Sequence, residues 1–552
     1  MFEVCKRMSL SGWARVGTLV LLSIVFSGLV TALGSNLTKI TDESVTLDPG
    51  VAGSTVDLEV LINVYEPLVW YDGEDANTLV PWLATKVPTF ENGLVSENGM
   101  TITIPIRQGV KFHNGKELTA EDVKYTFDRI LIMAVAGNYT YRFLKGYLVP
   151  EKIKVLDPYT VEFTLEKLMP SFVRLLTLTS SGIVNKAYVE EHGGLTPGEV
   201  NLWMRDHACA TGPFTVETWV PNERIVLKRF DGYWREPAKS ETITFLPSSD
   251  ISTEILMLKN SEADIINMEG KFSHYDELAS IKGVRIQEGQ PRFNGDYIVF
   301  NMDIDTENMP PSDTIPSDFF KDINVRYGFI YAFPFDLYMT VVHAHGNERY
   351  VGPIPQGMLG DNPDLPLWQQ DLAKAETYFK RTEWWDKGFT ITMLALVGYT
   401  DWERGLLMFK DALEALNPKF HVNVQPIGVA DILAQIYTKP SSLPMYWWGL
   451  TCKFNDPDSL ARPLIHSKGS SAYYTGYSNP SVDQAIDEAF LSYDSTIRDG
   501  YYQLAEQLAY YDPPYIWIDV ETSFDVIRDN VKGFVSNPVY DGWYLYSVYK
   551  ED

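Results

Sequence analysis

Aromatic and acidic side chains gather between Tyr446 and Asp458, and this segment is the densest group of residues suited to holding a small ligand. Ligand clefts are mostly apolar and aromatic, with a few polar groups that orient the ligand. If the segment begins as a strand, Trp447 and Trp448 point to opposite faces, so one packs in the core while the other lines a cleft. Asp456 and Asp458 flank a proline, and they are either ligand groups or turn formers.

Signatures of catalysis and of cofactor binding are missing from the sequence. Residues 109–116 resemble a phosphate loop, but the glycine spacing is one residue too long, and Glu117 stands where Ser or Thr would bind magnesium. His343 and His345 would share one face of a strand, but no third metal ligand is evident nearby. No Ser-His-Asp set can be assembled from the spacing. These absences favour binding over catalysis, and we expect neither a metal nor another cofactor.

The composition is that of a large folded protein with an acidic surface. The chain has 552 residues, 45% of them hydrophobic, and 73 acidic against 46 basic residues give a net charge of −27. A chain of this length is expected to divide into two or three lobes. Such an acidic surface repels phosphate backbones, so we expect no nucleic acid partner.

Residues 1–34 have the layout of a secretory signal. Basic residues precede an uncharged, mostly apolar run, and small residues near Ala32 and Gly34 offer a cleavage site. The run is also long enough to remain as a membrane anchor, and we expect an extracytoplasmic protein in either case. In an oxidising compartment, Cys209 and Cys452 either form one disulfide or remain two buried thiols.

Short strand-like and helical patterns alternate along the chain, which indicates a mixed α/β architecture with helices packed on sheets. Residues 101–107 are expected to form a strand, and a helix is expected to begin after its N-cap, Thr119. Residues 214–228 are expected to form a β-hairpin. Loosened stretches at residues 289–295 and 511–514 are followed by strand-like residues 296–302 and 515–520.

A series of motifs, in order along nearly the whole exported chain, resembles those of one protein family. The motifs are Asn63–Leu68, Val69–Arg129, Thr211–Trp219, Phe230–Trp234, Val325–Phe329, Gly352–Pro355, Gly476–Asp483 and Val531–Phe534. By these motifs the chain resembles the extracytoplasmic solute-binding proteins of family 5, which serve peptide, nickel and oligosaccharide ABC importers.

The resemblance implies an α/β fold of the two-lobed periplasmic-binding-protein type (type II, cluster C-like). It also implies an extra subdomain in lobe one and a two-strand hinge. Lobe one would comprise residues 35–290, with the inserted subdomain at about 75–178, and residues 521–552 would return to it. Lobe two would comprise residues 291–520, and the two hinge strands would lie near residues 291–301 and 512–521.

The function implied by the resemblance is that of the substrate-binding component of an ABC importer. Such a protein captures an oligopeptide or oligosaccharide between its lobes and delivers it to a membrane permease, and it is usually a monomer. A secreted hydrolase acting on peptides or glycans is the alternative, because 73 acidic residues could contain a catalytic carboxylate pair.

Segment 446–458 resembles the family's cleft segment, with one departure. Lys453 stands where the family has the Asp that binds a peptide's α-ammonium, and a cation there would repel that group. Either an insertion moves the anchor to Asp456 or Asp458, or the ligand is not a peptide. The predicted ligand-binding residues are Trp70, Tyr71, Trp447, Trp448, Asp456, Asp458, Tyr473 and Tyr474.

Overall fold

The computed structural model describes residues 35–41, 44–248, 250–267, 274–342, 347–540 and 542–551. They belong to the compact unit Ser35–Asp552. The predicted signal or anchor at residues 1–34 lies outside the described residues, and so do His343 and His345. Within the described ranges, no helix combines the length and the hydrophobicity needed to cross a membrane.

Eleven of the described strands form one sheet with the order β14-β13-β15-β11-β16-β10-β1-β9-β8-β7, in which β12 also pairs with β16. These strands are β1 (Ser35–Thr41), β7 (Phe214–Val220), β8 (Arg224–Arg229), β9 (Ser240–Pro247), β10 (Ile265–Asn267), β11 (Val284–Phe300), β12 (Glu348–Arg349), β13 (Phe389–Leu396), β14 (Phe420–Ile427), β15 (Met445–Thr451) and β16 (Tyr515–Arg528). The β7–β8 hairpin confirms the predicted one.

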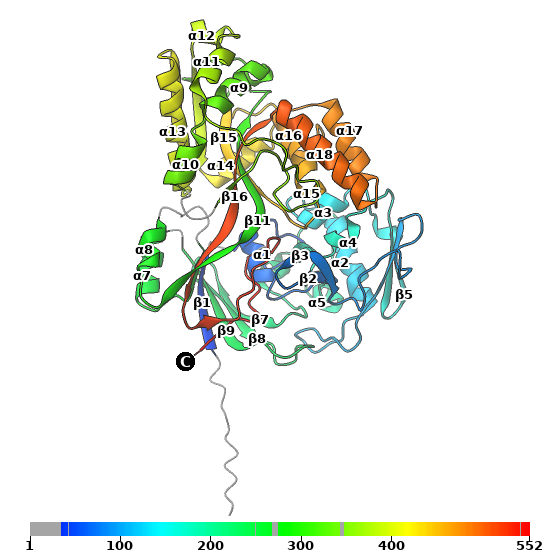
Figure 1. The fold of residues 1–552 in the computed structure, drawn as a ribbon. Coiled ribbons are helices and arrows are strands. Elements are labelled where there is room, and N and C mark those ends of the chain that lie inside the picture. Colours follow the sequence, from blue (N-terminus) through cyan, green and yellow to red (C-terminus); the bar gives the residue numbers. More distant parts are fainter. Residues whose placement is uncertain are drawn as a thin grey trace, which may run out of the picture. The chain divides into compact units, whose positions relative to one another are not determined.

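Strands β11 and β16 run side by side in the middle of this sheet (Figure 1). In the strand order, β15, β13 and β14 follow on the side of β11, and β10, β1, β9, β8 and β7 follow on the side of β16. The beginning of β11 pairs with the end of β16, next to β10, whereas the end of β11 lies between β15 and the beginning of β16. Their pairing shifts register at three places between Glu288 and Tyr297. The predicted lobe boundaries, 290/291 and 520/521, fall inside these two strands. That the two lobes move relative to each other about these boundaries remains a prediction.

Three smaller sheets complete the strand inventory of the described residues. They pair β2 (Val69–Asp72) with β3 (Asp75–Pro81), β4 (Thr101–Pro105) with β6 (Thr160–Thr164) and β5 (Ile153–Asp157), and β17 (Val531–Lys532) with β18 (Tyr549–Lys550).

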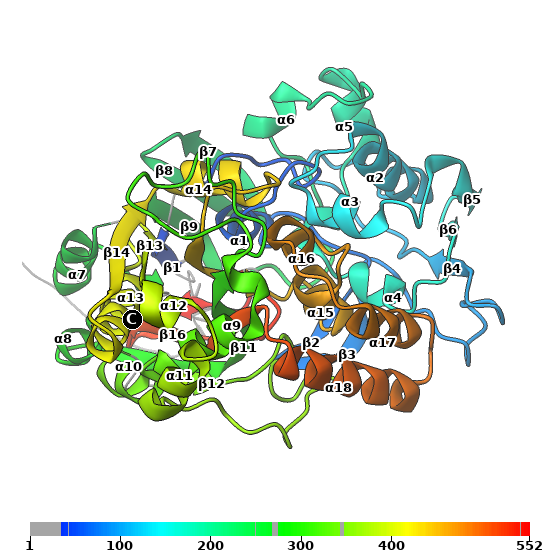
Figure 2. The same cartoon turned by 90° about the horizontal axis from the view of Figure 1, so that it is seen from above.

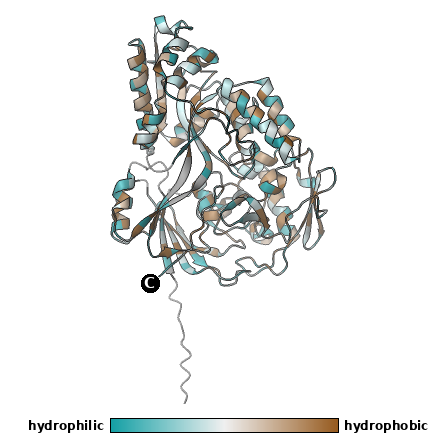
Figure 3. Ribbon diagram, viewed as in Figure 1, coloured by the Kyte–Doolittle hydropathy of each residue, from teal (hydrophilic) through white to brown (hydrophobic). Residues whose placement is uncertain are grey.

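Helices cover the sheets and turn one apolar face inward. In helix α13, Trp402, Leu406, Phe409 and Leu413 are buried at helical spacing, and Figure 3 shows hydrophobic and hydrophilic residues alternating along this ribbon. The helices are α1 (Thr55–Leu61), α2 (Ala120–Met133), α3 (Tyr139–Leu144), α4 (Phe172–Leu175), α5 (Lys186–Glu191), α6 (Leu202–Asp206), α7 (Ile251–Lys259), α8 (Tyr275–Ala279), α9 (Ile323–Ala332), α10 (Phe335–Val341), α11 (Leu372–Phe379), α12 (Trp384–Lys387), α13 (Thr400–Leu416), α14 (Val429–Ile436), α15 (Asp458–Ile465), α16 (Ser470–Thr475), α17 (Pro480–Phe490) and α18 (Ser495–Tyr511).

Helix α2 begins where the sequence predicts. Thr119 is its N-cap, and the Asp122 carboxylate accepts a hydrogen bond from the Thr119 backbone N–H at 2.9 Å, which completes a capping box. The helix packs against β5 and β6, and together they share a hydrophobic core formed mainly by residues 68–178. A separate core is formed mainly by residues 293–520, and a third by residues 37–65, 184–245 and 527–548.

Cys209 and Cys452 are buried free thiols, so the structure favours the second of the two alternatives for them. Burial raises the pKa of both thiols to about 11. Because the thiolate is the reactive form, we expect iodoacetamide at pH 8 to leave both cysteines unmodified in the folded protein and to alkylate both in denaturant. Peptide mass spectrometry measures this. Rapid native alkylation of either residue would contradict its burial.

Candidate ligand-binding site

A cavity of about 430 Å³ lies between helices α1 and α3 on one side and strands β11 and β15 with helices α14 and α16 on the other. Its volume is within the range of pockets that hold small organic ligands, roughly 300–1000 Å³. The lining residues are Gly53, Ser54, Thr55, Gly137, Tyr139, Arg142, Asn294, Asp296, Tyr297, Val299, Leu396, Tyr399, Trp402, Leu433, Ile436, Tyr437, Tyr446, Trp448, Gly449, Leu450, Thr451, Lys453, Ser470, Ser471, Thr475 and Tyr515. The wall therefore joins residues from before and after residue 290.

The two tryptophans of β15 face opposite ways. Trp448 lies on the cavity wall, directly across the strand pair from Tyr297 of β11. Trp447 is fully buried and packs against Tyr338 and Trp402, with ring centroids 5.2 and 6.1 Å away. Alternation along a strand explains the difference. The structure thus places Trp448, but not Trp447, where a ligand can reach it.

Several tyrosines give the cavity neutral hydroxyl groups. Burial raises the pKa of Tyr446 and of Tyr437, both of which line the cavity. Their phenols therefore stay protonated at neutral pH and can donate hydrogen bonds. With Trp448, they form an aromatic wall with polar edges, which suits a ligand that has both apolar and polar groups.

Asp296 of β11 is the acidic residue among the described residues that line the cavity. Its Oδ2 accepts a hydrogen bond of 2.6 Å from the indole N–H of Trp402. A side chain at Gly449 would place its Cβ 2.6 Å from Asp296 Oδ1, so this glycine makes room for the carboxylate. Trp402 and Gly449 therefore fix the direction of the Asp296 side chain.

Two cations, Lys453 and Arg142, line the cavity beside the same aromatic ring. The Lys453 ammonium lies 4.4 Å from the ring centre of Tyr139, and the Arg142 guanidinium lies 5.8 Å from it. Such cation–π contacts are favourable and restrict both side chains. Arg142 also donates a 3.2 Å hydrogen bond to Ser470 of α16. This link connects α3, which precedes the hinge strands, to α16, which lies between them in the sequence.

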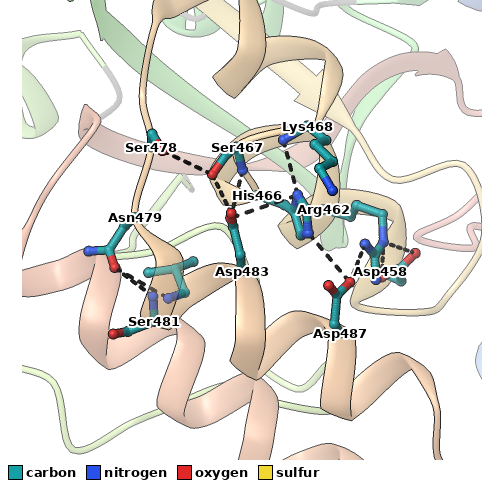
Figure 4. A network of polar contacts seen from close by, with 11 residues as sticks. Asp458, Arg462, His466, Ser467, Lys468, Ser478, Asn479, Ser481, Asp483 and Asp487 are labelled. Atoms are coloured by element: carbon teal, nitrogen blue, oxygen red, sulfur yellow. Dashed lines mark hydrogen bonds and ion pairs between the residues drawn. The ribbon is translucent and has the colours of Figure 1, made fainter.

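Asp456 and Asp458, two of the predicted ligand-binding residues, are not among the described residues that line this cavity. Asp456 forms a buried ion pair of 2.7 Å with Arg498. Asp458 begins α15, accepts a 2.9 Å hydrogen bond from Arg462 Nε, and lies near Tyr502. Figure 4 shows Arg462 between Asp458 and Asp487, in a network that holds α15 against α17. Both carboxylates are therefore paired with arginines in this structure.

The network belongs to the layer of α15, α17 and α18, and Figure 2 shows α17 and α18 packed side by side. Arg498 of α18 anchors this layer to Asp456 in the segment that follows β15, and Arg462 of α15 pairs with Asp487 of α17. In this segment, Lys453 lines the cavity, whereas Asp456 and Asp458 belong to the contacts of the helical layer.

The four other predicted aromatic residues are also not among the lining residues. Trp70 is buried and stacks on Tyr540, with ring centroids 5.1 Å apart. Tyr71 is buried, and its hydroxyl accepts a 3.2 Å hydrogen bond from the backbone N–H of Asn455. Tyr473 is 48% exposed on α16, and Tyr474 packs edge-on against Tyr437. Trp70 and Tyr71 thus fill contacts inside the protein.

Sequence reasoning missed Asp296, Tyr139, Arg142 and Trp402 as lining residues. Tyr139 and Arg142 lie on α3, which begins after its N-cap, Asn138. Asp296 lies at the start of a predicted strand, and no local pattern distinguishes it. In the part of the chain that the structure covers, His, Cys, Asp and Glu side chains form no group of three suited to a metal ion.

A comparison with known families gives one match that spans most of the chain. The sequence profile described as "Bacterial extracellular solute-binding proteins, family 5 Middle" matches residues 78–472. Among curated proteins, the glutathione-binding protein GsiB of Salmonella paratyphi A is 26% identical over 512 residues, which cover 92% of this chain and 91% of GsiB.

Solved structures share the fold. The periplasmic binding protein DppA from Helicobacter pylori, in complex with the peptide STSA, superposes with a TM-score of 0.78 at 21% identity, over 94% of this chain and 98% of DppA. The oligopeptide-binding protein AppA from Bacillus subtilis, in complex with a nonapeptide, gives 0.78 at 19% identity, over 94% and 99%. The two-lobed α/β fold expected from the sequence is therefore confirmed.

Proposed function

Because this chain belongs to family 5 of the bacterial extracellular solute-binding proteins, we propose that it captures a short peptide and delivers it to the permease of an ABC importer. The observation that carries the proposal is the cavity itself. It joins both lobes, has an aromatic wall, and contains charged groups of both signs. A peptide offers the matching groups, namely an ammonium, a carboxylate and apolar side chains.

Binding would act on the equilibrium between open and closed lobes. A ligand that contacts α3 in lobe one and β11 and β15 in lobe two gains more contacts when the lobes close, so it favours the closed form. The permease would then recognise that form. We further propose that the protein acts outside the cytoplasm as a monomer, with residues 1–34 as its export signal or anchor, and that it releases its ligand chemically unchanged.

The first test is a thermal-shift screen of the purified protein with dipeptides, tripeptides including glutathione, cello-oligosaccharides and nickel with histidine. A ligand at 100 times its dissociation constant stabilises the folded state by about 2.7 kcal/mol, which gives a clear rise in melting temperature. We expect the rise with peptides. A rise with oligosaccharides alone would overturn the peptide proposal, and hydrolysis of the added ligand would favour the secreted hydrolase.

A further inference from the structure

The short segment 453–455, which follows β15, joins the two proposed lobes. It belongs to lobe two, but its residues contact elements that precede the hinge strands. The Lys453 ammonium lies 4.4 Å from the ring centre of Tyr139, and the Phe454 ring packs edge-on against that of Phe143, with centroids 4.9 Å apart. Figures 1 and 2 both show helix α15, which begins soon after this segment, beside the β2–β3 hairpin.

Asn455 binds this hairpin through hydrogen bonds from its backbone and from its side chain. Its backbone N–H donates to the Tyr71 hydroxyl at 3.2 Å. Its side-chain amide donates to the Ala76 carbonyl at 3.0 Å and to Asn77 Oδ1 at 2.9 Å. These bonds exist only while the hairpin and Asn455 are in contact. They therefore stabilise that arrangement, each by the modest net amount typical of protein hydrogen bonds.

The apolar contacts at the same place are reciprocal. Phe454 is fully buried and belongs to the hydrophobic core formed mainly by residues 68–178. Conversely, Tyr71 of β2 and Ala76 of β3 belong to the core formed mainly by residues 293–520. Each lobe thus places side chains in the core of the other. Separating the lobes here would expose these side chains to water, which is unfavourable.

The contact of Asn455 with the hairpin adjoins the cavity but lies outside its wall. Lys453 lines the cavity, whereas Asn455 and Asn77 are not among the described residues that do so. A substitution at Asn455 therefore leaves the residues of the cavity wall unchanged. It would act on a ligand through the arrangement of the lobes.

We propose that Asn455 is a positioning residue that latches lobe two to the β2–β3 hairpin of lobe one and so stabilises the closed form. The inference rests on the proposed function, because the latch affects capture only if a ligand occupies the cavity. Opening the lobes breaks the hydrogen bonds of Asn455, and closing restores them. The latch thus favours closing by the same amount for every ligand, whereas the cavity wall determines which ligand binds.

The first measurement is single-molecule energy transfer between two dyes, one in each lobe, without ligand. Lys154 of β5 and Lys380, which follows α11, have exposed side chains. Both can be replaced by cysteine for labelling, with Cys5 replaced by serine. We expect Asn455→Ala to lower the ratio of closed to open molecules by about tenfold, because it removes both hydrogen bonds of the side-chain amide.

The second measurement is calorimetric titration with the tripeptides Ala-Ala-Ala and Ala-Phe-Ala, which differ in one side chain. The apparent affinity depends on the fraction of protein that is in the closed form. Asn455→Ala should therefore weaken the binding of both tripeptides by one common factor, which the ratio from energy transfer predicts. Dissociation, measured by displacement in a stopped-flow instrument, should become faster, because release requires opening.

Asn77→Ala tests the latch from the side of lobe one. Asn77 is exposed, so we expect this variant to fold, and it removes one hydrogen bond of the Asn455 side chain. The ratio of closed to open molecules should fall by about threefold. Adding Asn77→Ala to Asn455→Ala should cause no further fall, because the two residues act through one contact.

Asn417→Ala is the matched control. Asn417 is buried like Asn455, and its amide donates a 2.8 Å hydrogen bond to the Trp385 carbonyl, but both of these residues belong to lobe two. This variant should lower the free energy of unfolding in urea. It should leave the ratio of closed to open molecules and both affinities unchanged.

The outcomes separate this inference from the proposed function. An unchanged ratio in Asn455→Ala, or an equal fall in Asn417→Ala, would overturn the latch. Unequal losses of affinity for the two tripeptides would show that Asn455 contacts the ligand, which would also overturn it. If the ratio falls as expected but no peptide binds to the wild-type protein, the latch stands and the proposed function fails.

Discussion

Replacing Trp447 with alanine is expected to lower the free energy of unfolding by about 3–5 kcal/mol, the range for a large buried aromatic side chain. Trp447 is fully buried, and Phe333, Tyr338 and Trp402 surround its ring. A Cβ at Gly405 would lie 2.6 Å from the Trp447 ring, so helix α13 approaches the indole closely. Alanine would leave a cavity that these rigid neighbours cannot fill.

Replacing the next residue, Trp448, with alanine should affect stability only slightly and ligand affinity strongly. Its side chain borders the cavity and therefore makes fewer packing contacts than that of Trp447. We expect the free energy of unfolding to fall by less than about 2 kcal/mol. Affinity for a bound peptide should fall about tenfold or more, because aromatic residues at binding sites contribute strongly. Urea unfolding and calorimetric titration measure the two effects. Equal stability losses in the two variants, with unchanged affinity in Trp448→Ala, would contradict the assignment of Trp448 to the binding site.

The second large effect is expected at Asp525, in the hinge strand β16. The residue is fully buried, and burial raises the pKa of its carboxyl group from 3.8 to about 6, although Arg292 and Lys39 act in the opposite direction. Its Oδ1 accepts a hydrogen bond from the Trp543 indole at 3.1 Å, whereas Oδ2 has no hydrogen-bond partner among the described residues. An asparagine can keep the first contact without introducing a buried negative charge.

The raised pKa determines how stability depends on pH. Between about pH 4 and pH 6, the folded protein holds a proton on Asp525 that the unfolded chain has released, so this group's contribution to stability falls as pH rises. Above pH 6, the ionised Asp525 lowers the free energy of unfolding by its full amount, about 2–3 kcal/mol, because a pKa difference of one corresponds to about 1.36 kcal/mol. Asp525→Asn should therefore stabilise the protein by this amount at pH 8 and by little at pH 4.

Urea unfolding at both pH values tests this expectation, and Asp264→Asn is its control. Asp264 is also buried, but it forms a 3.0 Å ion pair with Lys550 and accepts a hydrogen bond from the Thr38 backbone N–H. Its replacement should destabilise the protein at pH 8, because it removes the charge that pairs with the partly exposed Lys550. Destabilisation by Asp525→Asn at both pH values would show that the Asp525 carboxylate is ionised and stabilising in the folded state.

Local patterns predicted local structure well. The β7–β8 hairpin and the N-cap of α2, Thr119, depend on residues a few positions apart, so their signals are complete within a short window. The strand pattern of residues 515–520 was also correct, but β16 continues to Arg528. The sequence predicted a loosened stretch before the strand at residue 296, whereas β11 begins at Val284 and crosses the stretch through register shifts. These register shifts depend on the pairing with β16, which is distant in the sequence, so a short stretch of sequence cannot predict them.

The site was harder to predict because its wall is assembled from remote segments. Trp448 could be singled out together with its neighbour, since alternation requires one of the two to leave the core. The ion pair of Asp456 could not be predicted, because Arg498 becomes its neighbour only through tertiary packing. Arg462, in contrast, lies one turn after Asp458 in α15, at a spacing visible in the sequence. Asp296 and Arg142 meet the same cavity from positions 154 residues apart in the sequence (296 minus 142).

Strand β11 combines two tasks that many proteins give to separate elements. Its register shifts lie between Glu288 and Tyr297, and its residues Asn294, Asp296, Tyr297 and Val299 line the cavity. In the proposed function, a ligand on this wall would therefore touch the hinge strand directly, without a relay of intervening side chains. Intrinsic affinity and the closing equilibrium cannot then be adjusted independently. A substitution in this strand that retunes selectivity also resets the fraction of closed protein, and the measured affinity contains both changes.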